Sequence, residues 1–406
     1  MKNLWTLYQT IYHFELKKIL SKKIVWIMVG AMLILTGLTI CGQLLGGYYV
    51  DGKKLDSTYN VLQKSREAER KLTGRVIDQQ LLDETWEGYG KIPAAIDHYT
   101  GTEEYWEYAF PYSAVFNFAR NAVHMNISDA FVWEADEEEM YSIRQTMMED
   151  NWDSFYLTEG EKEYWRNQEL SVKKPVVYAY KEGWWMLLYG VYTIGIMAQL
   201  TTAVCLSNVF TVEQTRKTDQ LIFCSRYGKG TLYLAKLLAG VSFAVGTSLL
   251  YTIFTVLLTL MIYGCDGFSA AFQLIYPDCS APISVGEAVL IGYGLVPVGA
   301  VLASIFTMVL SEILRNGIGT LAAISGTIIL SMFVNIPYHY RLLAQIWDFL
   351  PSIFLSIWGV FDCRLVPFFG TYLTGIQFVP ILYILTAGIL SVTGFKIYQK
   401  YQVGAR

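Results

Sequence analysis

Long apolar runs recur along this 406-residue chain, separated by polar segments of very different lengths. Six of them are long enough, as helices rising about 1.5 Å per residue, to cross the roughly 30 Å hydrocarbon core of a bilayer. They are residues 24–46, 184–210, 234–263, 284–311, 317–337 and 372–395. The pattern predicts an all-α membrane protein with six transmembrane helices, which we number as spans one to six.

A shorter amphipathic pattern precedes span one. Apolar side chains recur at helical spacing on one face of residues 3–20, and they are Trp5, Tyr8, Tyr12, Leu16 and Ile19. We expect residues 1–23 to form an amphipathic elbow helix that lies in the cytoplasmic interface. Glu15 sits close to the apolar stripe. The alternative is a plain cytoplasmic extension.

The longest polar stretch, residues 48–182, lies between spans one and two. It holds 26 Asp and Glu against 15 Lys and Arg, whereas the rest of the chain holds 9 against 16. Helix-forming residues dominate it, and the alternation typical of strands is scarce. We expect a mainly helical, acidic domain. Its many Trp and Tyr residues suit core packing or a groove for an amphiphile.

Basic residues beside the spans predict the orientation. They gather at the N-terminus, in the segment 211–230 between spans two and three, and at the C-terminus from Lys396. Such residues favour the cytoplasmic side, and with six spans all three places share one side. We therefore expect cytoplasmic termini, an extracellular domain at 48–182, and a multi-pass protein of a bacterial plasma membrane.

Residues 346–361 are apolar but short, and Pro351 interrupts them. A seventh span here would place the basic C-terminus outside. We instead expect a re-entrant outer hairpin of short helices before span six, since irregular backbone at membrane depth is tolerated where protein buries it. Residues 231–406 then comprise spans three to six, their outer loops and a cytoplasmic tail.

The segment 211–230 is unusually charged for a connection between two spans. The candidate contact residues in this segment are Glu213, Arg216, Lys217, Thr218, Asp219, Leu221 and Arg226, together with Lys236 near the start of span three. As a helix, the segment would pair Glu213 with Arg216 and Lys217. Charged and apolar side chains held at a membrane surface suit the docking of a protein partner. A plain loop is the alternative.

The sequence offers little catalytic chemistry. The glycine-rich stretch 227–231 lacks the spacing of a phosphate-binding loop, so we expect this chain not to be an enzyme and to hold no cofactor. Its few His residues are scattered and no Cys pair has metal-ligand spacing, so we expect no metal site. No nucleic-acid partner is expected. Cys265 and Cys279 could form a disulfide in the outer loop or remain free thiols.

The frame resembles the permease subunits of ABC exporters of the type-2 family. Those subunits have an elbow helix, six spans with both ends inside, and a loop after span two with a characteristic set of residues. Here these are Glu213, Thr218, Leu221, Arg226 and Lys236. Lys217 departs from the pattern, because a Gly usually precedes the Thr, and no Pro precedes Arg226.

The resemblance implies the partners and the activity. A separate cytoplasmic ATP-binding subunit would hold the ATP and bind the elbow helix and residues 211–229. A second permease subunit, identical or homologous, would complete the path through the membrane. The expected activity is export of an amphiphile such as an antimicrobial peptide, a drug or a lipid.

Two other classes of protein stay open. The first is a membrane-anchored sensor or assembly protein that binds cationic peptides through its acidic outer domain. The second is an ion-coupled carrier, which the scarcity of charged residues within the spans disfavours, because carriers need ionisable groups near the membrane midplane.

The orientation can be tested with single cysteines at Ser57, Ser225 and Gln402 in a cysteine-free background. A membrane-impermeant thiol reagent added outside intact cells should label only position 57. Labelling of position 402 from outside would contradict the six-span topology.

Overall fold

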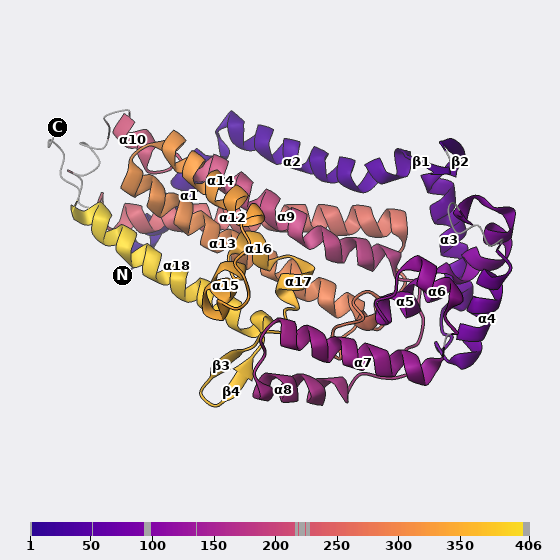
Figure 1. Ribbon diagram of the computed structural model, residues 1–406. Coiled ribbons are helices and arrows are strands. Elements are labelled where there is room, and N and C mark those ends of the chain that lie inside the picture. The colour runs from indigo at the N-terminus through magenta and orange to yellow at the C-terminus, as the bar shows by residue number, and fades with distance from the viewer. Residues whose placement is uncertain are drawn as a thin grey trace.

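The computed structural model describes residues 2–50, 52–92, 99–134, 136–215, 218, 224 and 228–400. This part of the chain is mostly helical, as the sequence predicts, and its strands form two short antiparallel hairpins. A long helical bundle carries a smaller helical block at one end (Figure 1). The start of the first helix and the end of the last helix lie at the opposite end of the bundle. We call these ends the block end and the termini end.

Eight helices build the bundle. They are α1 (Lys2–Leu20), α2 (Lys23–Gly42), α9 (Glu182–Leu206), α10 (Thr211–Thr215), α12 (Thr231–Tyr263), α13 (Val285–Leu314), α14 (Gly317–Phe333) and α18 (Gly375–Lys400). Among the described residues, five are long and apolar enough to cross a membrane, namely α2, α9, α12, α13 and α18. Five such helices indicate a multi-pass membrane protein.

The fifth expected span, residues 317–337, is shorter in the structure. Its helix α14 has 17 residues and ends at Phe333, after which Val334 is extended. Pro337 explains the early end, because a proline removes a backbone donor and disfavours helix in the residue before it. At the other end, the Asn316 side chain caps α14 by accepting hydrogen bonds from the backbone of Ile318 and Gly319.

Local sequence sets the start of α13 in the same way. The Ser284 hydroxyl accepts from the backbone N–H of Glu287, and the Glu287 carboxylate accepts from the backbone N–H of Ser284 at 2.8 Å. This reciprocal cap satisfies two donors that a helix start leaves unpaired. The helix ends at Arg315, whose left-handed backbone (φ 51°) turns the chain towards α14.

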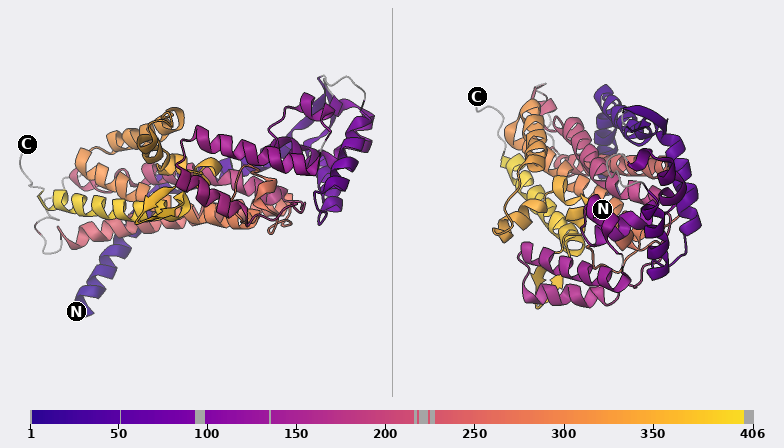
Figure 2. Two further views of the ribbon diagram at one scale, coloured as in Figure 1. Left: turned by 60° about the horizontal axis from the view of Figure 1, so that its bottom comes forward. Right: turned by 45° about the vertical axis from the view of Figure 1, so that its right-hand side comes forward.

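The helix α9 is the centre of the bundle. The most apolar window of this span is 67% buried, against 22% for that of α2 and 28% for that of α12. Small residues let other elements approach it closely, as Gly195 does for the side chain of Leu355. Figure 2 shows that α1, by contrast, projects from the bundle at an angle.

Short helices replace a span at residues 341–360, as the interruption at Pro351 predicts. They are α15 (Arg341–Asp348), α16 (Pro351–Phe354) and α17 (Ile357–Val360), followed by the strands β3 (Val366–Phe368) and β4 (Thr371–Leu373). We call residues 341–373 the hairpin. Gln199 of α9 donates to the Pro351 carbonyl at 3.0 Å. Because Gln199 is about 26 Å along α9 at about 1.5 Å per residue, the hairpin reaches deep between the long helices.

The block at residues 47–181 is mainly helical. It contains β1 (Gly47–Val50), β2 (Lys53–Ser57), α3 (Thr58–Leu72), α4 (Gln79–Gly90), α5 (Ser113–Ala122), α6 (Ile127–Val132), α7 (Glu137–Ser154) and α8 (Glu159–Glu169). Single turns are η1 (Gln43–Leu45), η2 (Tyr99–Gly101), η3 (Tyr105–Ala109), η4 (Phe110–Tyr112) and, outside the block, η5 (Phe272–Leu274). The strand pair β1–β2 lies at the start of the block. The helix-rich composition of this stretch did not indicate it.

Bundle loops complete the core of the block. Ala270, Leu274 and Val285 belong to its largest apolar cluster, and Leu365 of the hairpin belongs to another. The buried Arg144 of α7 donates to the Pro277 carbonyl at 2.8 Å. The block therefore shares its core with the rest of the chain.

Candidate functional site

Four ionisable side chains meet inside the bundle at the termini end. Glu213 comes from α10, Lys236 from α12, and Glu15 and Lys18 from α1. The Lys236 ammonium lies 2.7 Å from the Glu213 carboxylate and 3.8 Å from that of Glu15. The Lys18 ammonium lies 2.7 Å from Glu213 and 3.4 Å from Glu15. We call these four residues the charge cluster.

Most of the charge cluster is buried. Lys236 has no exposed surface, and Glu15 and Glu213 are 4% and 8% exposed. Two acids and two bases cancel, which makes their removal from water tolerable. Lys236 also donates to the Val209 carbonyl at 2.9 Å. Loss of one member would leave an uncompensated buried charge, which typically costs about 3–5 kcal/mol.

The charge cluster joins the elbow helix to two elements that lie about two hundred residues later in the sequence. The elbow helix α1 supplies two members, the short helix α10 after α9 supplies the third, and α12 supplies the fourth. The Tyr12 hydroxyl of α1 donates to the Ser242 hydroxyl of α12 at 2.8 Å, and Ile19 of α1 is buried in the bundle core. The elbow helix is thereby fastened to α12.

Lys18 is the most accessible member of the charge cluster. Burial lowers the pKa of Lys18, but its hydrogen bond to Glu213 and its attraction to Glu15 outweigh burial, so the pKa is raised above its usual value. A raised pKa in the folded state means that the stabilisation is fully present below the unfolded pKa of about 10.4 and is lost as the pH rises through the folded pKa. Lys18 therefore holds its proton at physiological pH.

The structure brings together two of the candidate contact residues, Glu213 and Lys236, and both side chains face the interior of the bundle. Glu213 pairs with Lys18 and Lys236. Thr218 is exposed, and its hydroxyl donates to the main-chain carbonyl of Glu213 at 3.3 Å. The other candidates lie outside the described residues, and they are Arg216, Lys217, Asp219, Leu221 and Arg226.

The pairing of Glu15 and Lys18 with these residues was not predicted. A signal was present, because Glu15 interrupts the apolar stripe of the elbow helix and Lys236 interrupts the apolar start of span three. A charge within an apolar face is seldom buried without a partner. Which charges meet, however, depends on contacts between residues about two hundred positions apart.

A further buried acid lies at the same end of the bundle. Glu312 is 1% exposed, and within the described part of the chain neither carboxylate oxygen has a hydrogen-bond partner. The predicted span four ended at residue 311, so Glu312 fell outside it. The helix continues to Leu314 and places this carboxyl group inside the bundle.

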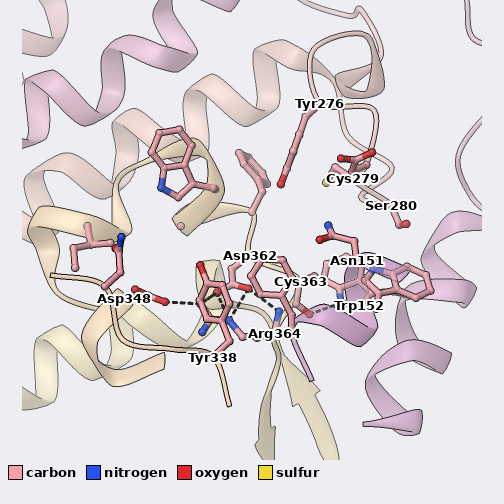
Figure 3. A pocket seen from close by; sticks show the side chains of 18 residues that line it. Asn151, Trp152, Tyr276, Cys279, Ser280, Tyr338, Asp348, Asp362, Cys363 and Arg364 are labelled. Atoms are coloured by element: carbon pink, nitrogen blue, oxygen red, sulfur yellow. Dashed lines mark hydrogen bonds and ion pairs between the residues drawn. The ribbon is translucent and has the colours of Figure 1, made fainter. Parts of the chain in front are cut away.

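A second charged centre lies where the block meets the hairpin (Figure 3). The buried Arg364 guanidinium lies 2.6 Å from the Asp348 carboxylate and also contacts Asp362. Burial raises the pKa of Asp362 in spite of this partner. The rings of Phe155 and Tyr338 flank the guanidinium, with centroids 5.7 and 4.9 Å away.

The pocket around Arg364 has a volume of about 130 Å³. Trp152 and Trp165 of the block line it opposite the hairpin, and the Trp165 indole donates to the Cys363 carbonyl at 2.6 Å. Nη1 of Arg364 has no hydrogen-bond partner among the described residues. The hydrogen bond of Trp165 and the packing of Phe155 against the Arg364 guanidinium hold the block on the hairpin.

The two cysteines considered for a disulfide are free thiols in the structure. Cys265 is exposed, whereas Cys279 is buried and lines the pocket around Arg364. Burial raises the pKa of Cys279 to about 12. This thiol therefore stays protonated at neutral pH, which makes it a poor nucleophile.

No protein-family model, curated protein or solved structure matches the chain. The interpretation of both charged centres therefore rests on their residues and contacts. Glu213 of the charge cluster comes directly before the charged segment between α10 and α12 in the chain.

The Lys236–Glu213 pair can be tested by reversing its charges. Lys236→Glu and Glu213→Lys should each lower the free energy of unfolding by about 3 kcal/mol or more, because each leaves like charges buried together. The double reversal should recover only part of this loss, because it restores the attraction between positions 213 and 236 but places like charges beside Lys18 and Glu15. Thermal unfolding of the purified chain in lipid discs measures the effect.

The matched control is Lys17→Glu, which reverses an exposed charge on α1 beside the charge cluster. It should change stability by less than about 1 kcal/mol. If either buried reversal behaved like this control, the pairing would be refuted.

Proposed function

We propose that this chain is the transmembrane permease subunit of an ATP-driven ABC exporter of the type-2 family. In this proposal it has six spans, with both termini and residues 211–230 in the cytoplasm. The observation that carries the proposal is the charge cluster, which joins the elbow helix α1 to α10 and α12 beside the charged segment. An ATPase that binds the segment could act on the long helices through this joint.

The proposed mechanism follows from the ion pairs that connect α1, α10 and α12. A cytoplasmic ATP-binding subunit grips α1 and residues 211–229, and ATP closes two such subunits on each other. Because α1, α10 and α12 share buried ion pairs, a force on α10 is passed to the helices instead of being lost in local bending. Two permease subunits, identical or homologous, then move apart and open a path between them.

The class of substrate is an amphiphile, such as an antimicrobial peptide, a drug or a lipid. The acidic block would stand outside the cell at the exit of the path. Its excess of Asp and Glu over Lys and Arg favours a cationic compound there. Export would move such a compound away from the membrane of the cell that makes the transporter.

Two alternatives have their own support. The acidic block suits a sensor or assembly protein that binds cationic peptides without transport. The buried Glu312 suits an ion-coupled carrier, because an unpaired carboxyl group among membrane helices can bind a proton or a cation. A sensor would bind peptide without consuming ATP, and a carrier would need an ion gradient.

Purification from native membranes, followed by ATP turnover in lipid discs, tests the proposal. The chain alone should hydrolyse no ATP, whereas the complex with its ATP-binding subunit should. Arg226→Glu should reduce ATPase co-purification and turnover by about tenfold or more, because a like-charge clash at a desolvated contact can cost several kcal/mol.

The control is Lys396→Glu, which reverses a base near the C-terminus and should leave docking intact. Normal docking and turnover with Arg226→Glu would remove the coupling role of this segment. Robust ATP turnover by the single chain, or transport driven by an ion gradient with no ATPase, would refute the proposed function itself.

A further inference from the structure

A groove of about 360 Å³ lies between α2, α9 and α12 near the block end. Along α9 its wall is a single stripe of residues, 182, 185, 186, 189, 190 and 193. These positions follow helical spacing, so the groove runs for about 16 Å along the helix at about 1.5 Å per residue. Its size lies within the range of small-molecule sites, roughly 300–1,000 Å³.

The exposure of the lining residues shows which way the groove opens. Thr255 and Thr259 of α12 are buried and form its floor. Trp185 and Tyr189 of α9 and Thr39 of α2 are exposed and form its rim. The groove therefore opens between α2 and α9, on the side of the bundle that would face lipid.

The floor offers a hydrogen-bonding group that the protein does not use. Thr36 and Thr39 on the α2 wall each donate to a carbonyl one turn earlier, at 2.9 Å. Thr255 is 3% exposed, yet its hydroxyl has no hydrogen-bond partner in the described part of the chain. A buried hydroxyl without a partner is costly, and a ligand in the groove would provide one.

The mouth of the groove carries a carboxylate. Glu182 is the first residue of α9, and across the described residues its side chain makes no hydrogen bond or ion pair. The neighbouring Lys181 ammonium lies instead over the Tyr178 ring, 5.1 Å from its centroid. Burial makes a carboxylate without an ion-pair partner costly, so a cation beside Glu182 would stabilise its charged form.

We infer that this groove binds a single-chain cationic amphiphile. The cation lies beside Glu182, the chain lies along the α9 stripe, and a polar group near the head bonds to the hydroxyls of Thr255 and Thr259. The charge of Glu182 argues against a phospholipid in this position, because its phosphate would lie next to the carboxylate. The site needs no ATPase, so it stands or falls separately from the proposed function.

Photolabelling of the full chain in phosphatidylcholine discs tests the site. The probe is dodecanamidopropyl-trimethylammonium with a diazirine at the end of its chain, and its anionic counterpart is the matching sulfonate. The cationic probe should label α9 and α12 peptides of the groove at a concentration at least about tenfold lower than the sulfonate, because only one of the two is attracted to Glu182.

Variants separate the two parts of the site. Glu182→Gln should remove the preference for the cation, Glu182→Asp should keep it, and Glu138→Gln, an exposed acid of the block, should change nothing. The double variant Thr255→Val with Thr259→Val should weaken the amide probe about fivefold, the worth of one hydrogen bond. It should not affect dodecyltrimethylammonium, which lacks the amide.

Three outcomes would overturn the inference. They are equal labelling by the cationic and anionic probes, a cation preference that survives Glu182→Gln, and a phospholipid that stays bound in the groove and that the probe cannot displace. Because Glu182→Asp retains the charge, its normal binding also shows that the folded groove tolerates substitution at this position.

Discussion

The Lys236 ammonium has no exposed surface, and the bundle must neutralise it. Glu213 does so, but Glu213 reaches it only because the chain turns after α9 and starts α10. Glu15 and Lys18 then complete a neutral group, which requires α1 to pack on α12. One buried base thus determines how the end of α9, the start of α12 and the elbow helix are held together.

This constraint separates what the sequence could predict from what it could not. The apolar runs predicted the long helices, Pro351 predicted the break in the hairpin, and Pro337 accounts for the early end of α14. These are local effects. The predicted pairing of Glu213 with Arg216 and Lys217 lies outside the described residues. The contacts of Glu213 with Lys18 and Lys236 were not predicted, because only the packing of α1 and α12 brings these residues close.

The same limit applies at the block end. Composition indicated a helical acidic block but not its dependence on the rest of the chain. Arg144 binds the Pro277 carbonyl of a bundle loop, and Trp165 binds the Cys363 carbonyl of the hairpin. The hairpin in turn receives the hydrogen bond from Gln199 of α9. The central helix α9 is therefore connected to both parts. It leads into α10 of the charge cluster, and through the hairpin it is linked to the block.

If the charge cluster holds α1 and α12 as one body, the distance between these two helices should be well defined. Spin labels at the exposed positions Thr10 and Leu238 would report their separation by electron–electron double resonance in lipid discs. We expect one narrow distance distribution for the native cluster and a broad one for Glu213→Ala, while Lys17→Ala stays narrow. A native distribution that is already broad, or one that Glu213→Ala leaves unchanged, would contradict this expectation.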